Sequence, residues 1–152
     1  MLESLKVPQF EAQATEGKTV SPAGERGHPF VLYFYPKDNT PGCTDEGIQF
    51  RDLYDAFQRV GCHIYGVSRD SMTSHEGFKA KMSFPFELIS DPDEKLCQMF
   101  GVIKMKNMYG KQVRGIERST FVIDANGVVR KEWRGVKVPG HAQEVLEFVK
   151  SM

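Results

Sequence analysis

The stretch PFVLYFYPKDNTPGCT, residues 29–44, joins a strand-like run to the start of a helix. Residues 29–36 are almost all apolar and end in a proline, which is typical of a central strand buried on both faces. Over residues 44–60, apolar side chains recur mostly every three or four positions, which predicts an amphipathic helix. Pro41 disfavours helix in the residues before it, so we expect the helix to begin between Pro41 and Cys43.

The remaining segments alternate between strand-like and helix-like patterns. Short strands are expected over residues 8–14, 16–22, 62–68 and 86–90, and a hairpin over 118–133. Helices are expected over residues 71–82, 91–102 and 141–152. In the last helix Val145, Leu146 and Val149 share the face that we expect to be buried. This order predicts a single α/β domain over residues 1–152, with a central mixed sheet flanked by helices.

Composition excludes several classes of function. The 152 residues contain 20 Lys plus Arg and 20 Asp plus Glu, which gives no general electrostatic attraction to nucleic acid or an anionic membrane. We find no secretory signal and no apolar run long enough to span a membrane. Three cysteines without an export signal argue against a disulfide framework and favour a cytoplasmic location. Such a sparse set raises the question of whether one thiol is reactive.

Cys43 is the candidate reactive thiol. In the first turn of a helix, a thiol is close to unpaired backbone N–H groups and to the positive end of the helix dipole. Both favour the thiolate, which is the nucleophilic form. The alternative is a small, inert, buried cysteine. We favour that alternative for Cys62, in an apolar strand, and for Cys97, on the apolar face of a short helix.

The residues around Cys43 resemble a known active-site motif. The spacing of Pro36, Thr40 and Cys43 within YPKDNTPGCT resembles that of peroxiredoxins. The blocks GVSRDS, SDPDEKLCQMFGV and GIERSTFVIDANG follow in order, so the chain resembles the bacterioferritin comigratory protein (PrxQ) subfamily over nearly its whole length. The resemblance implies a thioredoxin-like fold and a peroxidase that reduces hydrogen peroxide and organic hydroperoxides without a cofactor.

In such a reaction the Cys43 thiolate attacks the O–O bond and becomes a sulfenic acid. We expect the Thr40 hydroxyl to touch both peroxide and sulfur, and the backbone N–H groups of Gly42 and Cys43 to hold the peroxide oxygens. Pro36 is expected to shield the sulfur from water.

The resemblance implies a cation near the sulfur, Arg118, which would stabilise the thiolate and donate hydrogen bonds to the peroxide. Arg114 is a nearby competitor for this role. Two interpretations of Glu46 remain open: a salt bridge that orients Arg118, or an ordinary carboxylate in the first turn of a helix.

The chain departs from the subfamily at one position. Many members carry a second, resolving cysteine five residues after the first, where this chain has Ile48. We therefore favour a one-cysteine mechanism in which an external thiol, from glutathione, glutaredoxin or thioredoxin, reduces Cys43. The alternative is resolution by Cys97 or Cys62, but bridged Cα atoms must lie within about 7 Å, and a buried thiol would have to move far.

The same sequence bears on other possible functions. A thiol–disulfide oxidoreductase needs a C-x-x-C pair, which the sequence lacks. The four histidines are scattered without ligand spacing, so no metal site is predicted. A non-enzymatic peroxide sensor or holdase stays open, as do a monomer and a weak dimer. Met99, Met105 and Met108 are interpreted as packing residues rather than an apolar entrance, and Tyr109 is expected in a loop.

Overall fold

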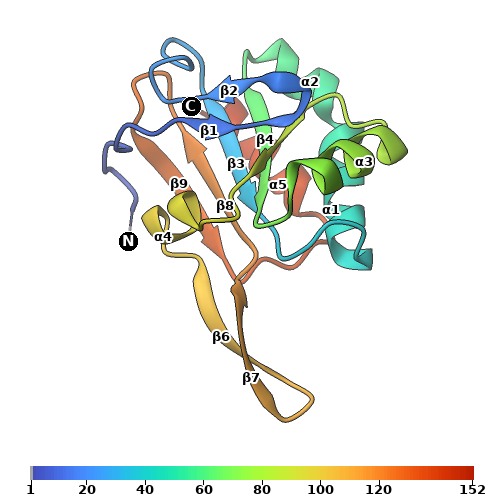
Figure 1. Cartoon of the computed structure of the whole chain (residues 1–152). Coiled ribbons are helices and arrows are strands. Elements are labelled where there is room, and N and C mark those ends of the chain that lie inside the picture. The colour runs from blue at the N-terminus through green and yellow to red at the C-terminus, as the bar shows by residue number, and fades with distance from the viewer. Residues whose placement is uncertain (1) are drawn as a thin grey trace.

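The computed structural model describes residues 2–152, apart from the side chain of Met108, and its centre is a five-stranded mixed sheet (Figure 1). The strands in spatial order are β5 (Glu87–Ser90), β4 (His63–Ser68), β3 (Phe30–Phe34), β8 (Ser119–Ile123) and β9 (Val129–Arg134). The central strand β3 pairs in parallel with β4 and antiparallel with β8. The predicted mixed sheet and the hairpin formed by β8 and β9 are confirmed.

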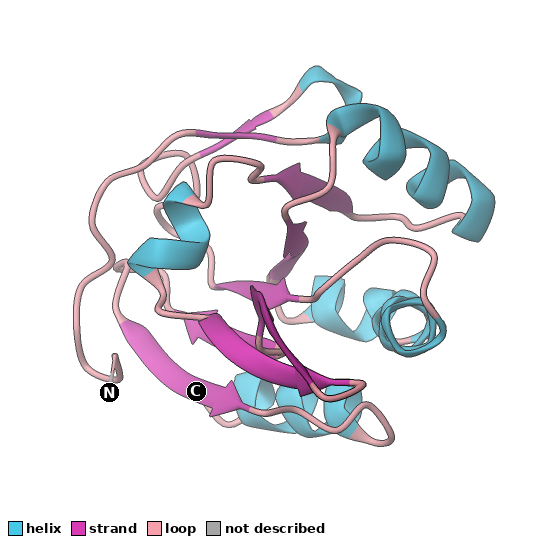
Figure 2. Cartoon of the chain, turned by 60° about the horizontal axis from the view of Figure 1, so that its bottom comes forward, coloured by secondary structure: helices cyan, strands magenta, loops and turns pink. Residues whose placement is uncertain are grey.

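Helices lie on both sides of this sheet (Figure 2). They are α1 (Pro41–Asp52), α2 (Tyr54–Arg59), α3 (Met72–Met82), α4 (Lys95–Met99) and α5 (His141–Lys150). Along β3, alternate side chains enter two separate hydrophobic cores, as the period of a strand requires. Phe30, Leu32 and Phe34 pack in the core that contains α4, and Val31 and Tyr33 pack in the core that contains α1 and α5. The side chains of all five are 0–1% exposed, so the strand is buried on both faces as predicted.

Most of the expected helices are present, with shifted ends. Helix α1 begins at Pro41, within the predicted interval, but the helix expected over 44–60 is interrupted at Leu53. There the Leu53 N–H is shared between the carbonyls of Gln49 and Phe50, a local tightening at the end of α1. Helix α4 starts later than predicted, because the Asp91 carboxylate accepts hydrogen bonds from its backbone N–H groups.

The apolar pattern of the sequence predicts the final helix correctly but overestimates the length of the N-terminal strands. In α5, the predicted face of Val145, Leu146 and Val149 is buried. The two strands expected near the N-terminus are shorter in the structure: β1 (Ala12–Gln13) and β2 (Thr19–Val20), which flank the 3₁₀-helix η1 (Thr15–Gly17).

None of the described helices combines the length and the apolar character that a membrane crossing requires.

A second hairpin, absent from the sequence prediction, extends from the body of the protein (Figure 1). Strands β6 (Ile103–Met108) and β7 (Lys111–Ile116) pair antiparallel with each other alone among the described strands. Tyr109 and Gly110 both have positive φ, 53° and 78°, as a two-residue hairpin turn requires. The loop expected at Tyr109 is therefore this turn.

The packing role expected for the methionines is confirmed for one of them. Met99 is partly buried against the hydrophobic core. Met105 is 60% exposed on the second hairpin, so its interpretation as a packing residue is wrong. The side chain of Met108 lies outside the described part of the structure.

Two helical glycines provide a matched test of packing. A methyl group at Gly47 in α1 would lie 2.9 Å from Cε1 of Phe84, a buried ring that cannot retreat because it stacks on Phe86 at 5.0 Å. We expect Gly47→Ala to lower the free energy of unfolding by about 1–3 kcal/mol. In α3, Gly77 has no neighbour within 4 Å of such a methyl group. Gly77→Ala should raise stability by about 0.5–1 kcal/mol. Urea denaturation measures both, and equal shifts in one direction would contradict the packing argument.

Candidate active site

Cys43 lies in the first turn of α1, directly after the end of β3 and a short loop. Pro41 occupies the first helical position, where its missing N–H costs nothing, and Thr40 precedes it in extended conformation. The Cys43 side chain is buried, with 2% exposure, and belongs to the core beneath α1 and α5.

Arg118 is brought to Cys43 by the pairing of β3 with β8. Ser119 is opposite Phe34 in this pairing, so Arg118, one residue earlier, lies beside the end of β3. Its Nη2 donates to Cys43 Sγ at 3.4 Å, and its Nη1 donates to Glu46 Oε1 at 2.6 Å. The structure thus brings together three residues that the sequence analysis singled out, two from α1 and one from the segment before β8, 72 or more positions apart.

Gly42 makes this approach possible. A Cβ atom at position 42 would lie 3.1 Å from Arg118 Nη2, tighter than ordinary van der Waals contact. A side chain there would push the guanidinium away from the sulfur. The expected supporting role of Gly42 therefore has a steric component in addition to its backbone N–H.

Glu46 is buried, with 1% exposure, and only one of its carboxylate oxygens is paired. Among the described residues, Oε2 has no hydrogen-bond partner. Burial raises the pKa of Glu46 to about 7, although the charge and hydrogen bond of Arg118 oppose this rise. Arg118 and Glu46 form an ion pair at 2.6 Å. Desolvation nevertheless raises the pKa of Glu46 by more than this pairing lowers it, because one carboxylate oxygen is left without a donor in the described part of the chain.

The other arginine considered from sequence is engaged elsewhere. Arg114, on β7, donates through Nη2 to Glu94 Oε1 at 2.5 Å, and Arg69 donates to the same carboxylate at 2.9 Å. A cation that the sequence analysis missed is Lys106 of β6, whose ammonium donates to the Ile116 carbonyl. Burial, and then the positive charge of Arg118, lower the pKa of Lys106. Cys43 also acts electrostatically on the pKa of Lys106, in the opposite direction. No local spacing in the sequence predicts this, because Lys106 lies on the unpredicted hairpin.

Two further motif residues lie in the loop before α1. The Thr40 hydroxyl donates to the Lys37 carbonyl at 2.8 Å, which leaves the lone pairs of its oxygen available as acceptors. Pro36 is half-buried where this loop leaves β3.

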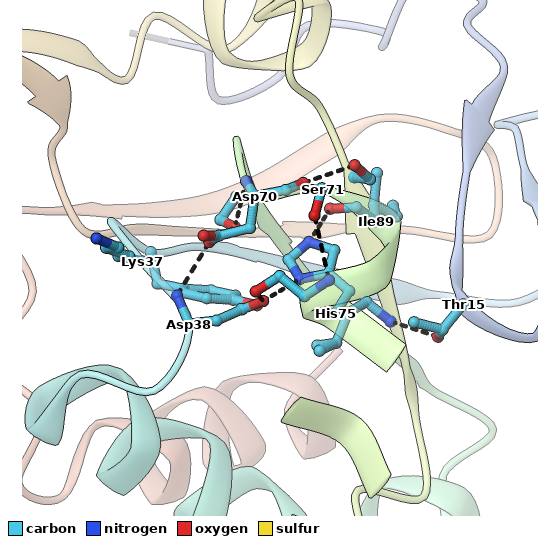
Figure 3. A network of polar contacts seen from close by, with 12 residues as sticks. Thr15, Lys37, Asp38, Asp70, Ser71, His75 and Ile89 are labelled. Carbon is cyan, nitrogen blue, oxygen red and sulfur yellow. Dashed lines mark hydrogen bonds and ion pairs between the residues drawn. The ribbon is translucent and has the colours of Figure 1, made fainter. Parts of the chain in front are cut away.

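Between Pro36 and Thr40, the loop carries Asp38, which the sequence analysis did not single out. Its carboxylate accepts from the Tyr35 hydroxyl at 2.7 Å and lies 2.7 Å from Nδ1 of His75, whose side chain is fully buried (Figure 3). Ligand atoms of Asp38, Asp70 and His75 lie within 4.8 Å of one another, a grouping compatible with a metal ion. Each residue is already hydrogen-bonded to protein groups, so we treat the cluster as a polar network.

The remaining cysteines lie away from Cys43. Cys97 is in the core on the opposite face of the sheet, and Cys62 immediately precedes β4. Both are fully buried, and all three cysteines are free. Burial raises the pKa of the Cys62 thiol to about 12 and raises that of Cys97 further, so neither forms a thiolate readily.

Comparisons with known proteins agree with this geometry. The AhpC/TSA family model matches residues 4–132. Peroxiredoxin Bcp of Xanthomonas campestris is 58% identical over 125 residues, which cover 82% of this chain and 78% of that protein. Peroxiredoxin Bcp of Bacillus subtilis is 47% identical over 147 residues, which cover 97% of this chain and 94% of that protein.

Solved structures agree as well. A structure of X. campestris Peroxiredoxin Q has a TM-score of 0.89 and 52% identity, covering 93% of this chain and 90% of that chain. A structure of the bacterioferritin comigratory protein of the same organism, described for its alkyl peroxide reduction activity, has a TM-score of 0.89 and 51% identity over the same shares. These matches confirm the thioredoxin-like fold and the resemblance seen in the sequence. The chain belongs to the AhpC/TSA family, in its Bcp (PrxQ) subfamily of peroxiredoxins, and is a thiol peroxidase.

Proposed function

We propose that Cys43 is the peroxidatic residue of this enzyme and that an external thiol regenerates it. The observation that carries the proposal is the contact of the Cys43 sulfur with Arg118, which is itself held by Glu46. The substrates are hydrogen peroxide and organic hydroperoxides. The alkyl peroxide reduction activity of the X. campestris relative supports the second class.

The proposed reaction uses the groups around the sulfur in one displacement. The Cys43 thiolate attacks the terminal oxygen of R–O–O–H, an S–O bond forms, and the O–O bond breaks. The product is a sulfenic acid, and the leaving alkoxide or hydroxide takes up a proton to become an alcohol or water. Arg118 stabilises the thiolate and the departing oxygen. Thr40 accepts a hydrogen bond from the peroxide O–H, and the N–H groups of Gly42 and Cys43, in the first turn, donate to its oxygens. Pro36 excludes water.

We propose direct reduction of the sulfenic acid by glutathione, glutaredoxin or thioredoxin in a reducing cytoplasm, and no internal disulfide. Ile48 removes the nearby resolving cysteine, and the central sheet lies between Cys43 and Cys97. Cys62 is at the other end of the parallel strands, beside the start of β3. Cys43 follows the end of that five-residue strand, which spans about 13 Å at ~3.3 Å per residue. A disulfide allows about 7 Å between Cα atoms.

Mass spectrometry tests the thiol assignment. After one equivalent of hydrogen peroxide with a sulfenic-acid trap, we expect a single adduct on Cys43. Cys43→Ser should abolish turnover with any thiol donor, whereas Cys62→Ser and Cys97→Ser should retain it. Loss of two hydrogens without an adduct would show an internal disulfide and contradict the one-cysteine mechanism. Fast oxidation of Cys43 with no turnover would favour a sensor.

A pair of arginine variants tests the cation. Arg118→Gln should slow oxidation of Cys43 by roughly 10²-fold or more, the scale of losing one charged donor at a reacting centre. Arg114→Gln removes the other arginine considered from the sequence, which pairs with Glu94, and serves as the control, with an unchanged rate expected. Stopped-flow oxidation by hydrogen peroxide measures both. Similar losses in the two variants would refute the assignment of Arg118.

The raised pKa of Glu46 has a measurable effect on stability. The folded-state pKa is about 7, and the ordinary value is 4.5, so between these values the folded state binds more protons than the unfolded state. The contribution of Glu46 to the free energy of unfolding is therefore present below about pH 4.5 and is lost as the pH rises towards 7. Urea denaturation of the wild type should show this fall relative to Glu46→Gln, which cannot titrate. Parallel profiles would mean that Glu46 ionises normally.

A further inference from the structure

We propose that Asp38 and His75 form a buried ion pair that positions the loop of residues 36–40 for the attack of Cys43 on peroxide. The inference rests on the proposed role of Cys43. Asp38 and His75 are positioning residues: they touch neither the sulfur nor the substrate, and they act through Pro36 and Thr40 on either side of Asp38.

The contacts of both ring nitrogens of His75 support the proposed ion pair. Nε2 lies 2.9 Å from the Ile89 carbonyl oxygen, which can only accept, so Nε2 carries a proton. Nδ1 lies 2.7 Å from Asp38 Oδ2, and in the proposed pair the ionised carboxylate accepts a hydrogen bond from a second proton on Nδ1. The ring is then an imidazolium, and its charge is matched by the carboxylate.

Both oxygens of the Asp38 carboxylate have hydrogen-bond partners. Oδ1 accepts from the Tyr35 hydroxyl at 2.7 Å, and Oδ2 accepts from Ser74 Oγ at 2.8 Å in addition to His75. Three donors converge on a side chain that is 1% exposed, and they stabilise its negative charge. No charge in the pair is left without a partner, which is the condition for a buried ion pair to persist.

The network ties the loop to three other elements (Figure 3). His75 and Ser74 are on α3, and Ile89 is on β5. The backbone N–H of Asp38 donates to Asp70 Oδ2 at 2.9 Å, just after β4. The main chain and the side chain of Asp38 are thus both fixed, from different directions.

This anchoring reaches the reacting sulfur through short segments of chain. Thr40 follows Asp38 by two residues, and its hydroxyl is oriented by the Lys37 carbonyl on the other side of Asp38. A displacement of the loop therefore moves the Thr40 oxygen relative to Cys43. Cys43 is 2% exposed and lies in the first turn after this loop, so in the proposal the loop also limits the approach of an external thiol to the sulfenic acid.

The pair should therefore have opposite effects on the two halves of the cycle. A firmly held loop favours oxidation, in which donors and sulfur must be aligned. It slows reduction, in which a larger thiol must reach the sulfur. A residue that contributes only to global stability would not change the two rates in opposite directions.

Three variants separate these roles. Asp38→Ala removes the anchor, whereas Asp38→Asn keeps the shape and donates from its amide to a neutral His75 ring. Thr15→Ala is the control: it removes two other buried hydrogen bonds, to Glu87 at 2.5 Å and from the Leu88 N–H at 3.0 Å, neither of which involves Asp38 or His75. Stopped-flow kinetics would measure oxidation of Cys43 by hydrogen peroxide and, separately, reduction of the sulfenic acid by glutathione.

We expect Asp38→Ala to slow oxidation at least about tenfold, since a displacement of about 1 Å can cost ~10²-fold. Reduction by glutathione should become faster in the same variant. Asp38→Asn should restore oxidation to within about threefold of wild type, on the scale of a retained hydrogen bond. Thr15→Ala should lower stability and leave both rates unchanged. Equal rates in Asp38→Ala and wild type, or the same rate changes in Thr15→Ala, would overturn the inference.

Two further measurements keep the test decisive. If Asp38→Ala does not fold, His75→Asn leaves the loop sequence intact and should show the same opposite changes in rate; unchanged rates would reject the proposal. ¹⁵N NMR of the wild type should show both ring nitrogens of His75 protonated at neutral pH, and one bare nitrogen would overturn the ion pair. If Cys43→Ser retains peroxidase activity, the proposed role of Cys43 fails instead.

Discussion

The contact between the Arg118 guanidinium and the Cys43 sulfur depends on strand register. Arg118 is beside the end of β3 only because Ser119 is opposite Phe34. Successive side chains of a strand point to opposite faces, so a slip by one residue would turn the arginine away from the core that holds Cys43. The antiparallel pairing of β3 with β8 is thus needed for the proposed role of Arg118 as well as being a source of stability. Burial then gives the interaction its strength, because charges attract more strongly where water is excluded.

The central sheet also separates the thiols from one another. Alternate side chains of β3 build two cores that do not mix, one with Cys43 and one with Cys97. The sheet therefore isolates Cys97 by topology, and the length of β3 separates Cys62. Neither of these thiols is placed to reach Cys43 directly, in keeping with the proposal that an external thiol reduces it.

Local rules predicted the central parts of this architecture and failed where contacts are distant. The strand β3 and the start of α1 follow from an apolar run and from Pro41, both readable within a few residues. The orientation of Arg118 by Glu46 was one of two open interpretations, and only the fold brings these residues within 2.6 Å. Asp38 and His75 are 37 positions apart, with no spacing that links them. The second hairpin was missed because its strands are rich in lysine and contribute little to either core.

The exposed strand edges of the β6–β7 hairpin could pair with the edges of another chain. Among the described strands, β6 and β7 pair only with each other, so the outer edge of each offers unpaired backbone groups to another chain. Residues 103–116 contain Lys104, Lys106 and Lys111, together with Arg114, which is paired with Glu94, and no acidic residue. Two such arms brought edge to edge would repel each other, and charged side chains, lysine above all, are the usual protection of exposed strand edges. The positive charge of the arm thus acts against the growth of an intermolecular sheet.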